Sequence, residues 1–223
     1  MAERSEKHSS FYNLMDAFKE KHCPFCYLSR KAVTGFLSGL LYENVNDPGI
    51  RNALKKAGGF CEKHSWQMVS LGDALGNAII VHDLLTDIRD NGVTGKMQSR
   101  RKCSGECPAC RAWNDAELRY MRVFVEYFED PELQAGFRKS FGLCRGHFDG
   151  MMKRLKAEQR PRLVTVEQQK LDALVEELSR FQEKFNYTAA ERTFGEDRDV
   201  WIRAVEFLKG RSDRFSEHMP PTD

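Results

Sequence analysis

The stretch CPFC occupies residues 23–26, and a matching stretch, CPAC, occupies residues 107–110. Each is followed by a second motif that ends in histidine, GFCEKH at residues 59–64 and GLCRGH at residues 142–147. The two CPxC stretches are 84 positions apart and the two CxxH stretches are 83 positions apart, so one residue has been gained or lost between the motifs of one copy. A pattern that returns at a constant offset indicates an internal duplication.

The spacing of the cysteines and histidines is typical of a metal site. Both sulfurs of a CPxC turn can reach one ion from the start of a helix, and CxxH places a sulfur and an imidazole on one helix face. Three thiolates and one imidazole form a soft, four-ligand set that suits tetrahedral Zn²⁺. We therefore predict two zinc ions, one bound within each copy, with an iron–sulfur cluster as the alternative. The predicted ligands are Cys23, Cys26, Cys61 and His64 in the first copy and Cys107, Cys110, Cys144 and His147 in the second.

Three other interpretations of the cysteines require features that the sequence lacks. Buried cysteines that serve only as small apolar residues need no regular spacing. A redox-active CPFC dithiol needs a strand before it, as part of a βαβ unit, and no strand is predicted before Cys23. Disulfides suit small secreted scaffolds, whereas this chain has 223 residues and an odd number of cysteines, seven.

The seventh cysteine, Cys103, forms the spacing CxxxCxxC with Cys107 and Cys110, which is typical of the cluster site of radical S-adenosylmethionine enzymes. Those enzymes build a partial (βα) barrel around the site, and no barrel strands are predicted here. Cys103 also falls outside the duplicated pattern, because Lys19 occupies its counterpart position. We interpret Cys103 either as a thiol in a linker or as a fifth ligand that would make the second site exchangeable or able to hold a cluster.

The composition limits the classes of function. Charged residues make up 30% of the chain and the net charge is only +2, which gives no electrostatic reason to expect nucleic-acid binding. The first ten residues, MAERSEKHSS, lack the apolar core of a signal peptide, and no apolar run approaches the length of a membrane span. Because thiolates held on a metal suit a reducing compartment, we expect a soluble cytoplasmic protein that does not bind membranes.

Apolar residues recur at helical spacing and no strand alternation persists, so the fold is predicted to be all-α. Each copy should contain three helices: one that begins at the CPxC proline, a short one opened by the Asp-Pro dipeptide at residues 47–48 or 130–131, and one that begins near the CxxH cysteine. In the first copy this third helix is expected to begin near Cys61, to carry apolar residues as far as Ile88 and to be stopped by Asn91-Gly92. An unrepeated pair of helices, at residues 166–187 and 198–209, should follow a connector.

The predicted organisation follows the two copies of the motifs. The segments are a helical lead-in at residues 1–22, a first metal-binding repeat at 23–92, a basic linker at 93–106, a second metal-binding repeat at 107–157, the C-terminal helices at 158–210 and a disordered tail at 211–223. The linker contains the cations of residues 96–102, which are interpreted as a solvated connector because they are few and lack interleaved aromatic residues.

The motifs together resemble an uncharacterised bacterial and archaeal protein family with duplicated CPxC and GFCxxH motifs. The stretch FNYTAAERTFGEDRDVWIRAVEFLKG at residues 185–210 is similar to the C-terminal signature of that family, GEDRDxWIRAxE. The resemblance covers residues 23–210 and implies no particular reaction. In the second copy Leu143 replaces the phenylalanine of the motif and Gly146 precedes the histidine, but neither change affects a predicted ligand.

Three functions are compatible with this pattern. The first is a non-enzymatic structural or interaction protein, in which two metal ions hold helix starts together and the helices bind a protein partner that the sequence does not identify. Four protein ligands leave no position for a catalytic water, which favours this function. The second is an iron–sulfur or thiol redox protein, a sensor or an electron carrier. The third is a metalloenzyme that uses Glu43 and Glu126, which the duplication pairs, as carboxylates near the metals.

Overall fold

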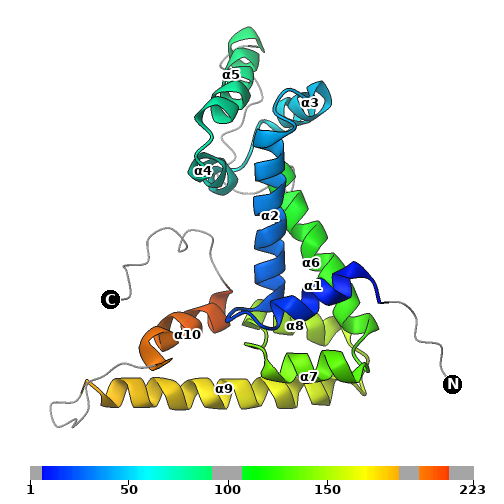
Figure 1. The fold of residues 1–223 in the computed structure, drawn as a ribbon, viewed down its shortest axis with the longest axis vertical. Helices are drawn as coiled ribbons and strands as arrows, with labels where there is room; N and C mark the ends of the chain where they lie inside the picture. Colours follow the sequence, from blue (N-terminus) through cyan, green and yellow to red (C-terminus); the bar gives the residue numbers. More distant parts are fainter. Residues whose placement is uncertain (1–6, 92–106, 186–195, 211–223) are drawn as a thin grey trace. The chain divides into compact units, whose positions relative to one another are not determined.

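The structure is a computed structural model that describes residues 7–91, 107–185 and 196–210 (Figure 1). Within these ranges the chain forms helices and no strand, which confirms the all-α prediction. The helices in chain order are α1 (Ser9–Ala17), α2 (Pro24–Tyr42), α3 (Pro48–Ala57), α4 (Glu62–Ser70), α5 (Ala74–Asn91), α6 (Pro108–Glu126), α7 (Pro131–Lys139), α8 (Arg145–Arg154), α9 (Arg160–Glu183), the 3₁₀ helix η1 (Glu196–Asp199) and α10 (Val200–Lys209). No helix in the described part of the chain is both long and apolar enough to cross a membrane.

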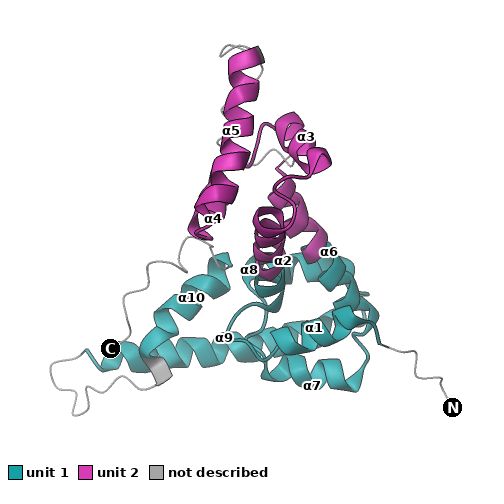
Figure 2. Cartoon of the chain, turned by 45° about the horizontal axis from the view of Figure 1, so that its top comes forward, with its two compact units in different colours: residues 1–28, 117–223 teal, residues 29–116 magenta. Residues whose placement is uncertain are grey.

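The described helices belong to two compact units (Figure 2). Unit 1 comprises residues 1–28 and 117–223, and unit 2 comprises residues 29–116. Helices α2 and α6 contribute to both units, because each unit boundary falls within one of them. Unit 1 therefore combines the start of α2 with the helices that follow the second CPxC motif, and unit 2 combines the start of α6 with the helices that follow the first. The compact units do not coincide with the two sequence copies.

Two helix starts form as the Asp-Pro dipeptides predict. The Asp47 side chain accepts a hydrogen bond of 2.8 Å from the backbone N–H of Ile50 at the start of α3. The Asp130 side chain accepts two, of 2.9 Å from Glu132 and 3.1 Å from Leu133, at the start of α7. In each helix the proline follows the capping aspartate, where its missing N–H removes no helical hydrogen bond. These caps fix where the two short helices begin.

The third helix of the first copy differs from the unbroken helix expected. Helix α4 ends at Ser70, and α5 begins at Ala74. Between them Gly72 adopts a φ of +79°, which is outside the helical range and is readily accessible only to glycine. The Asp73 side chain then accepts a 2.8 Å hydrogen bond from the N–H of Gly76 and so starts the next helix. A glycine followed by a capping residue therefore divides the predicted helix into two.

The duplication also extends further than the three helices expected. Helix α9 begins at Arg160, within the predicted connector, and its first half is the counterpart of α5. A Cβ atom on Gly59 would lie 3.1 Å from Leu84 of α5, and one on Gly142 would lie 3.1 Å from Glu167 of α9. Both pairs are 25 positions apart, and both glycines have a positive φ, of +87° and +90°. The same close approach of a loop to a helix therefore occurs in both copies.

Each unit has its own apolar core. In unit 1 the ring of Phe124 contacts four other aromatic rings at centroid distances of 5.0 to 6.4 Å, those of Phe18, Phe25, Phe128 and Phe137. In unit 2 the buried residues include Val33, Leu37, Leu40, Leu54, Met68 and Ile80. Burial of one such side chain contributes roughly 1.5–3 kcal/mol. The core of unit 2 contains Cys107 and Cys110, so its motif cysteines are continuous with its apolar packing.

One counterpart pair differs in chemistry, because the apolar Leu84 of the first copy corresponds to the acidic Glu167 of the second. Glu167 is 6% exposed, and its Oε1 accepts a 2.9 Å hydrogen bond from the backbone N–H of Leu143. Burial raises the pKa of the Glu167 carboxyl to about 8, despite the lowering effects of this hydrogen bond and of the Lys170 ammonium. At neutral pH the folded protein therefore keeps this side chain protonated.

We predict that the free energy of unfolding of the wild type falls relative to that of the Glu167→Gln variant as the pH rises. The unfolded chain releases the Glu167 proton near a pKa of 4.5, while the folded protein keeps it up to about 8. Between these values the folded state binds more protons, so stability decreases by at most about 1.4 kcal/mol per pH unit. Glutamine removes this dependence and keeps an acceptor for Leu143. Urea unfolding of both proteins across this range measures the difference, and a constant difference would contradict the prediction.

Candidate metal centres

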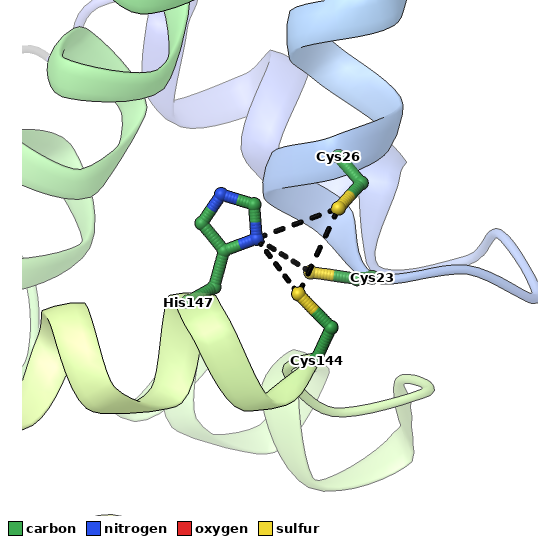
Figure 3. Close-up of side chains that lie close together, drawn as sticks. All are labelled: Cys23, Cys26, Cys144 and His147. Carbon is green, nitrogen blue, oxygen red and sulfur yellow. Dashed lines mark hydrogen bonds between the residues drawn. The ribbon is translucent and has the colours of Figure 1, made fainter. Parts of the chain in front are cut away.

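The first group of ligand residues, which we name cluster 1, lies in unit 1 and consists of Cys23, Cys26, Cys144 and His147. The two CPFC cysteines come from the start of α2, and the other two residues come from the start of α8 (Figure 3). The His147 Nδ1 atom lies 3.3, 3.4 and 3.1 Å from the sulfurs of Cys23, Cys26 and Cys144 respectively. The sulfurs of Cys26 and Cys144 are 3.8 Å apart. All four side chains are buried.

The second group, cluster 2, lies in unit 2 and consists of Cys61, His64, Cys107 and Cys110. Here the CPAC cysteines come from the start of α6, and the other two residues come from the start of α4. The His64 Nδ1 atom lies 3.3, 3.5 and 3.2 Å from the sulfurs of Cys61, Cys107 and Cys110 respectively. The sulfurs of Cys61 and Cys110 are 3.7 Å apart. Three of the residues are buried, and Cys61 is partly exposed.

The eight predicted residues are thus the ones that converge, but the prediction that each site forms within one copy is wrong. Each CPxC motif meets the CxxH motif of the other copy. The reason is the length of the helix between the motifs. Helix α2 has 19 residues, which corresponds to about 28 Å. Cys23 precedes this helix. Cys61 follows α3, which begins only after α2 has ended and packs into the core of unit 2 through Leu54. The two motifs of the first copy therefore lie at opposite ends of α2.

The spacing of the four ligand atoms fits a single tetrahedral ion. Zinc–sulfur bonds of about 2.3 Å and zinc–nitrogen bonds of about 2.0–2.1 Å place tetrahedral sulfurs about 3.8 Å apart and sulfur and nitrogen about 3.6 Å apart. The measured sulfur–sulfur distances are 3.8 and 3.7 Å, and the sulfur–nitrogen distances run from 3.1 to 3.5 Å. In both clusters all ligand atoms lie within 4.8 Å of one another. Each cluster could therefore hold a metal ion with little movement of its side chains.

Helix starts bring the sulfurs together in both clusters. Cys61 is the N-cap residue of α4 and Cys144 is that of α8, and neither side chain makes a capping hydrogen bond. Their backbone carbonyls accept the first helical hydrogen bonds, each of 2.9 Å, from Ser65 and Phe148. The partial positive charge of a helix N-terminus stabilises a nearby thiolate, which is the form of cysteine that binds metals. The local geometry therefore supplies both position and charge.

The four groups of cluster 1 perturb one another strongly. Burial raises the pKa of the Cys23 thiol well above its ordinary value. Hydrogen bonds from Cys23 and Cys26 hold the pKa of Cys144 far below its ordinary value. Burial lowers the pKa of His147, but hydrogen bonds with Cys144, Cys26 and Glu117 outweigh it and raise that pKa to about 12. These shifts favour a thiolate at Cys144 paired with the imidazolium of His147, and a divalent cation would offset the cost of a thiolate at Cys23.

Cluster 2 shows a weaker form of the same effect. Burial raises the pKa of Cys107, but hydrogen bonds from His64 and from the backbone at Cys61 and Cys110 bring it down to about 6. Burial raises the pKa of the Cys61 thiol. The neighbours of Cys107 thus favour its thiolate form near neutral pH, whereas burial disfavours that of Cys61.

One residue that the sequence analysis missed is Glu117, whose carboxylate contacts His147. Its Oε1 lies 2.7 Å from the Nε2 atom of that imidazole. A carboxylate that accepts from the second nitrogen fixes the ring tautomer, so that Nδ1 faces the sulfurs as an acceptor. No sequence signal pointed to Glu117, because its counterpart in the first copy, at the 84-residue offset of the CPxC helices, is the apolar Val33.

The C-terminal signature contributes to the surroundings of cluster 1. Gly210, which ends α10, has a φ of +73°, and a Cβ atom there would lie 3.2 Å from the sulfur of Cys26 and 3.4 Å from that of Cys144. Glu206 of α10 is 5% exposed, and its Oε2 lies 3.0 Å from Nδ1 of His22, which immediately precedes the CPFC motif. The end of α10 therefore covers cluster 1, and only a glycine fits at the closest point.

The other residues considered from the sequence do not join a cluster. Glu43 follows the last residue of α2 and Glu126 is the last residue of α6, both are exposed, and neither is among the grouped ligands. Cys103 lies outside the described residues, as do the predicted basic linker and tail. None of the six cysteines in the described ranges forms a disulfide. The described clusters therefore contain cysteine and histidine but no carboxylate.

The fold and the two clusters define an all-α protein with two Cys₃His groups, each able to hold a metal ion at the meeting point of two helix starts. The chain belongs to a family of unknown function, DUF6062, which matches it twice, over residues 10–102 and 86–214. Each match contains one CPxC and one CxxH motif, which fits the internal duplication and confirms the resemblance to an uncharacterised family.

A relative from Caldicellulosiruptor sp. (strain Rt8B.4), described as an uncharacterized 23.9 kDa protein in the xynA 3' region, is similar over almost its whole length. It is 30% identical over 202 residues, which cover 88% of this chain and 99% of the relative. No solved structure matches the chain.

We predict that the Gly210→Ala variant has a lower melting temperature and a faster reaction of Cys26 and Cys144 with N-ethylmaleimide. The new methyl group must push away the two sulfurs, and the positive φ adds backbone strain of about 1 kcal/mol or more. Thermal unfolding and peptide mass mapping measure the two effects. The control is Gly72→Ala, where φ is +79° and the Cβ atom would meet open space. That variant should lose stability without exposing the thiols of cluster 1, and equal labelling in both would contradict the prediction.

Proposed function

We propose that the protein is a non-enzymatic zinc protein in which each cluster binds one Zn²⁺ ion and joins two helix starts that are distant in the sequence. The observation that supports this proposal best is the spacing of the ligand atoms. Sulfurs at 3.7 and 3.8 Å and an imidazole nitrogen within 3.5 Å of each sulfur match the edges of a single tetrahedral site. The proposed ligands are the eight residues of clusters 1 and 2.

The same spacing favours a single ion over an iron–sulfur cluster. An iron–sulfur cluster places several metal and sulfide atoms between its protein ligands, so those ligands must stand farther apart than around one ion. In both clusters all four ligand atoms lie within 4.8 Å of one another. The histidine in each set also lowers the total charge at the metal and suits zinc.

A structural role follows from the closed ligand set. Catalytic zinc sites keep one position for water or substrate, whereas three cysteines and one histidine fill all four positions. Glu43 and Glu126, the carboxylates considered for catalysis, are exposed and outside both clusters. Because the ligands come from two helix starts, the binding free energy of the metal adds to the free energy of folding.

The cellular setting and the partner belong to the same proposal. Six cysteines without a disulfide in the described ranges favour a reducing compartment, and we propose the cytoplasm. With no chemistry assigned to the metals, the helices would serve to bind another protein. Large apolar side chains that unit 2 leaves exposed support this role, among them Trp66 at 68% and Leu75 at 71%.

Metal analysis of anaerobically purified protein tests the proposal directly. We expect two zinc ions per chain and no absorption in the visible range, since Zn²⁺ has a filled d shell. Removal of the metal with a chelator should lower the melting temperature, and return of zinc should restore it. Protein that contains iron and absorbs visible light would show the alternative redox function instead, and protein that binds no metal after supplementation would refute both.

We predict that Cys23→Ser removes one of the two zinc ions and exposes the remaining cysteines of cluster 1 only. Cys26 and Cys144 should then react with N-ethylmaleimide, while the cysteines of cluster 2 stay protected by their zinc. The loss of stability should be several kcal/mol, because metal binding contributes to folding. The matched variant, Cys107→Ser, should expose Cys61 and Cys110 instead.

Peptide mass mapping after a brief reaction separates this result from its alternative. If the sites formed within each copy, Cys23→Ser would expose Cys61 and leave Cys144 protected. That outcome would refute the crossed pairing of the motifs while leaving two zinc sites in place.

A further inference from the structure

We infer that the two zinc sites differ in function: cluster 1 holds a permanent ion, whereas cluster 2 is an exchangeable site that gives up and takes up Zn²⁺ in competition with other thiol or chelating ligands. This inference rests on the proposed function, because it assumes that both clusters bind zinc. It goes beyond that function, because it assigns reversible zinc binding to one half of a duplicated site. Three differences between the clusters carry it.

The first difference is the enclosure of the cysteine that begins the CxxH motif. A competing ligand must approach the metal or one of its thiolates before the ion can leave. In cluster 1 this cysteine is Cys144, which is 3% exposed and lies beside the end of α10. In cluster 2 it is Cys61, whose ligand atom is buried but whose residue is partly exposed.

The second difference is the support of the histidine ligand. The Nε2 atom of His147 lies 2.7 Å from the Glu117 carboxylate, which orients the ring and makes Nδ1 a stronger ligand. The Nε2 atom of His64 is buried and has no hydrogen-bond partner among the described residues. Loss of such a partner typically weakens metal binding by about 10–100-fold. The imidazole of cluster 2 is therefore the poorer ligand.

The first copy has no carboxylate at the corresponding place. Helices α2 and α6 both run for 19 residues from the proline of their CPxC motif, so their residues correspond at an offset of 84 and the counterpart of Glu117 is Val33, which is apolar and fully buried. The next residue, Thr34, faces the helix that carries the ligand, because its Oγ1 accepts a 3.4 Å hydrogen bond from Gln67, one turn beyond His64 on α4.

The third difference is the packing of the imidazole ring. The central aromatic residue of CPFC, Phe25, is fully buried, and its ring centroid lies 5.4 Å from that of His147. The corresponding residue of CPAC is Ala109, which offers only a methyl group. A ring held by an aromatic neighbour loses less freedom when it binds a metal, because it is already ordered. All three differences weaken cluster 2 relative to cluster 1.

Release of zinc from the fully loaded wild type tests the inference. The protein is mixed with a chromogenic chelator and a limiting amount of N-ethylmaleimide, and the labelled cysteines are mapped by mass at each time. We expect two phases of one zinc each, separated at least about 10-fold in rate. The fast phase should coincide with labelling of Cys61, Cys107 and Cys110, and the slow phase with labelling of the cysteines of cluster 1.

Two reciprocal variants test the cause. Thr34→Glu places a carboxylate on the side of α2 that faces α4 and should slow the fast phase by about 10-fold or more, while the control Thr34→Gln, which has similar size and no charge, should change it less. Glu117→Gln should accelerate the slow phase by a similar factor and leave the fast phase unchanged. Because neither residue is a zinc ligand, both variants should still bind two ions, and circular dichroism checks that they fold.

The possible outcomes separate this inference from the proposed function. Fewer than two zinc ions per chain after supplementation with zinc would refute the proposed function. Two ions released in a single phase, or a fast phase that maps to cluster 1, would leave the proposed function intact and overturn the inference. A Thr34→Glu protein that releases its first ion as fast as the wild type would also count against it, because histidine support would then not set the difference.

Discussion

The length of α2 and α6 is the constraint on which the rest of the structure depends. Each helix has 19 residues, so each carries the chain about 28 Å away from the CPxC motif that opens it. The short helix that follows packs where the long one ends, and the CxxH motif is therefore left beside the CPxC motif of the other copy. Division of the chain into two units that each combine parts of both copies is a direct result.

The duplication supplies two sites of nearly the same geometry in different surroundings. Ligand distances agree within a few tenths of an ångström between the clusters, because the same helix starts build both. The residues around the ligands have diverged: Glu117 and Phe25 of unit 1 correspond to Val33 and Ala109 of unit 2. The ligands of the motifs thus preserve the geometry, and the residues that are not ligands determine the environment of each ligand set.

Much of the architecture was predictable from local signals. The aspartate caps, the CPxC helix starts and the ligand residues each depend on neighbours within a few positions. The break between α4 and α5 was not predicted, because apolar residues recur at helical spacing on both sides of it. The turn is made by Gly72, which has a positive φ, and by Asp73, which caps the next helix. The pairing of each CPxC motif with the CxxH motif of the other copy could not be predicted from the motifs, because both copies carry the same ligand types. It follows from the length of the helices between the motifs. Glu117 gave no signal, since its role depends on a contact across 30 positions.

The crossed pairing has a consequence for the order in which the chain is made. His64 precedes Cys107 by 43 positions, which corresponds to about 2–9 s of synthesis at roughly 5–20 residues per second. During that interval the chain that has been made carries only the ligands of the first copy. Cluster 2 cannot form before Cys107 and Cys110 are made, and cluster 1 cannot form before Cys144 and His147 are made. The order of synthesis therefore makes cluster 2 the first that can close, although two of the ligands of cluster 1 are the first to be made.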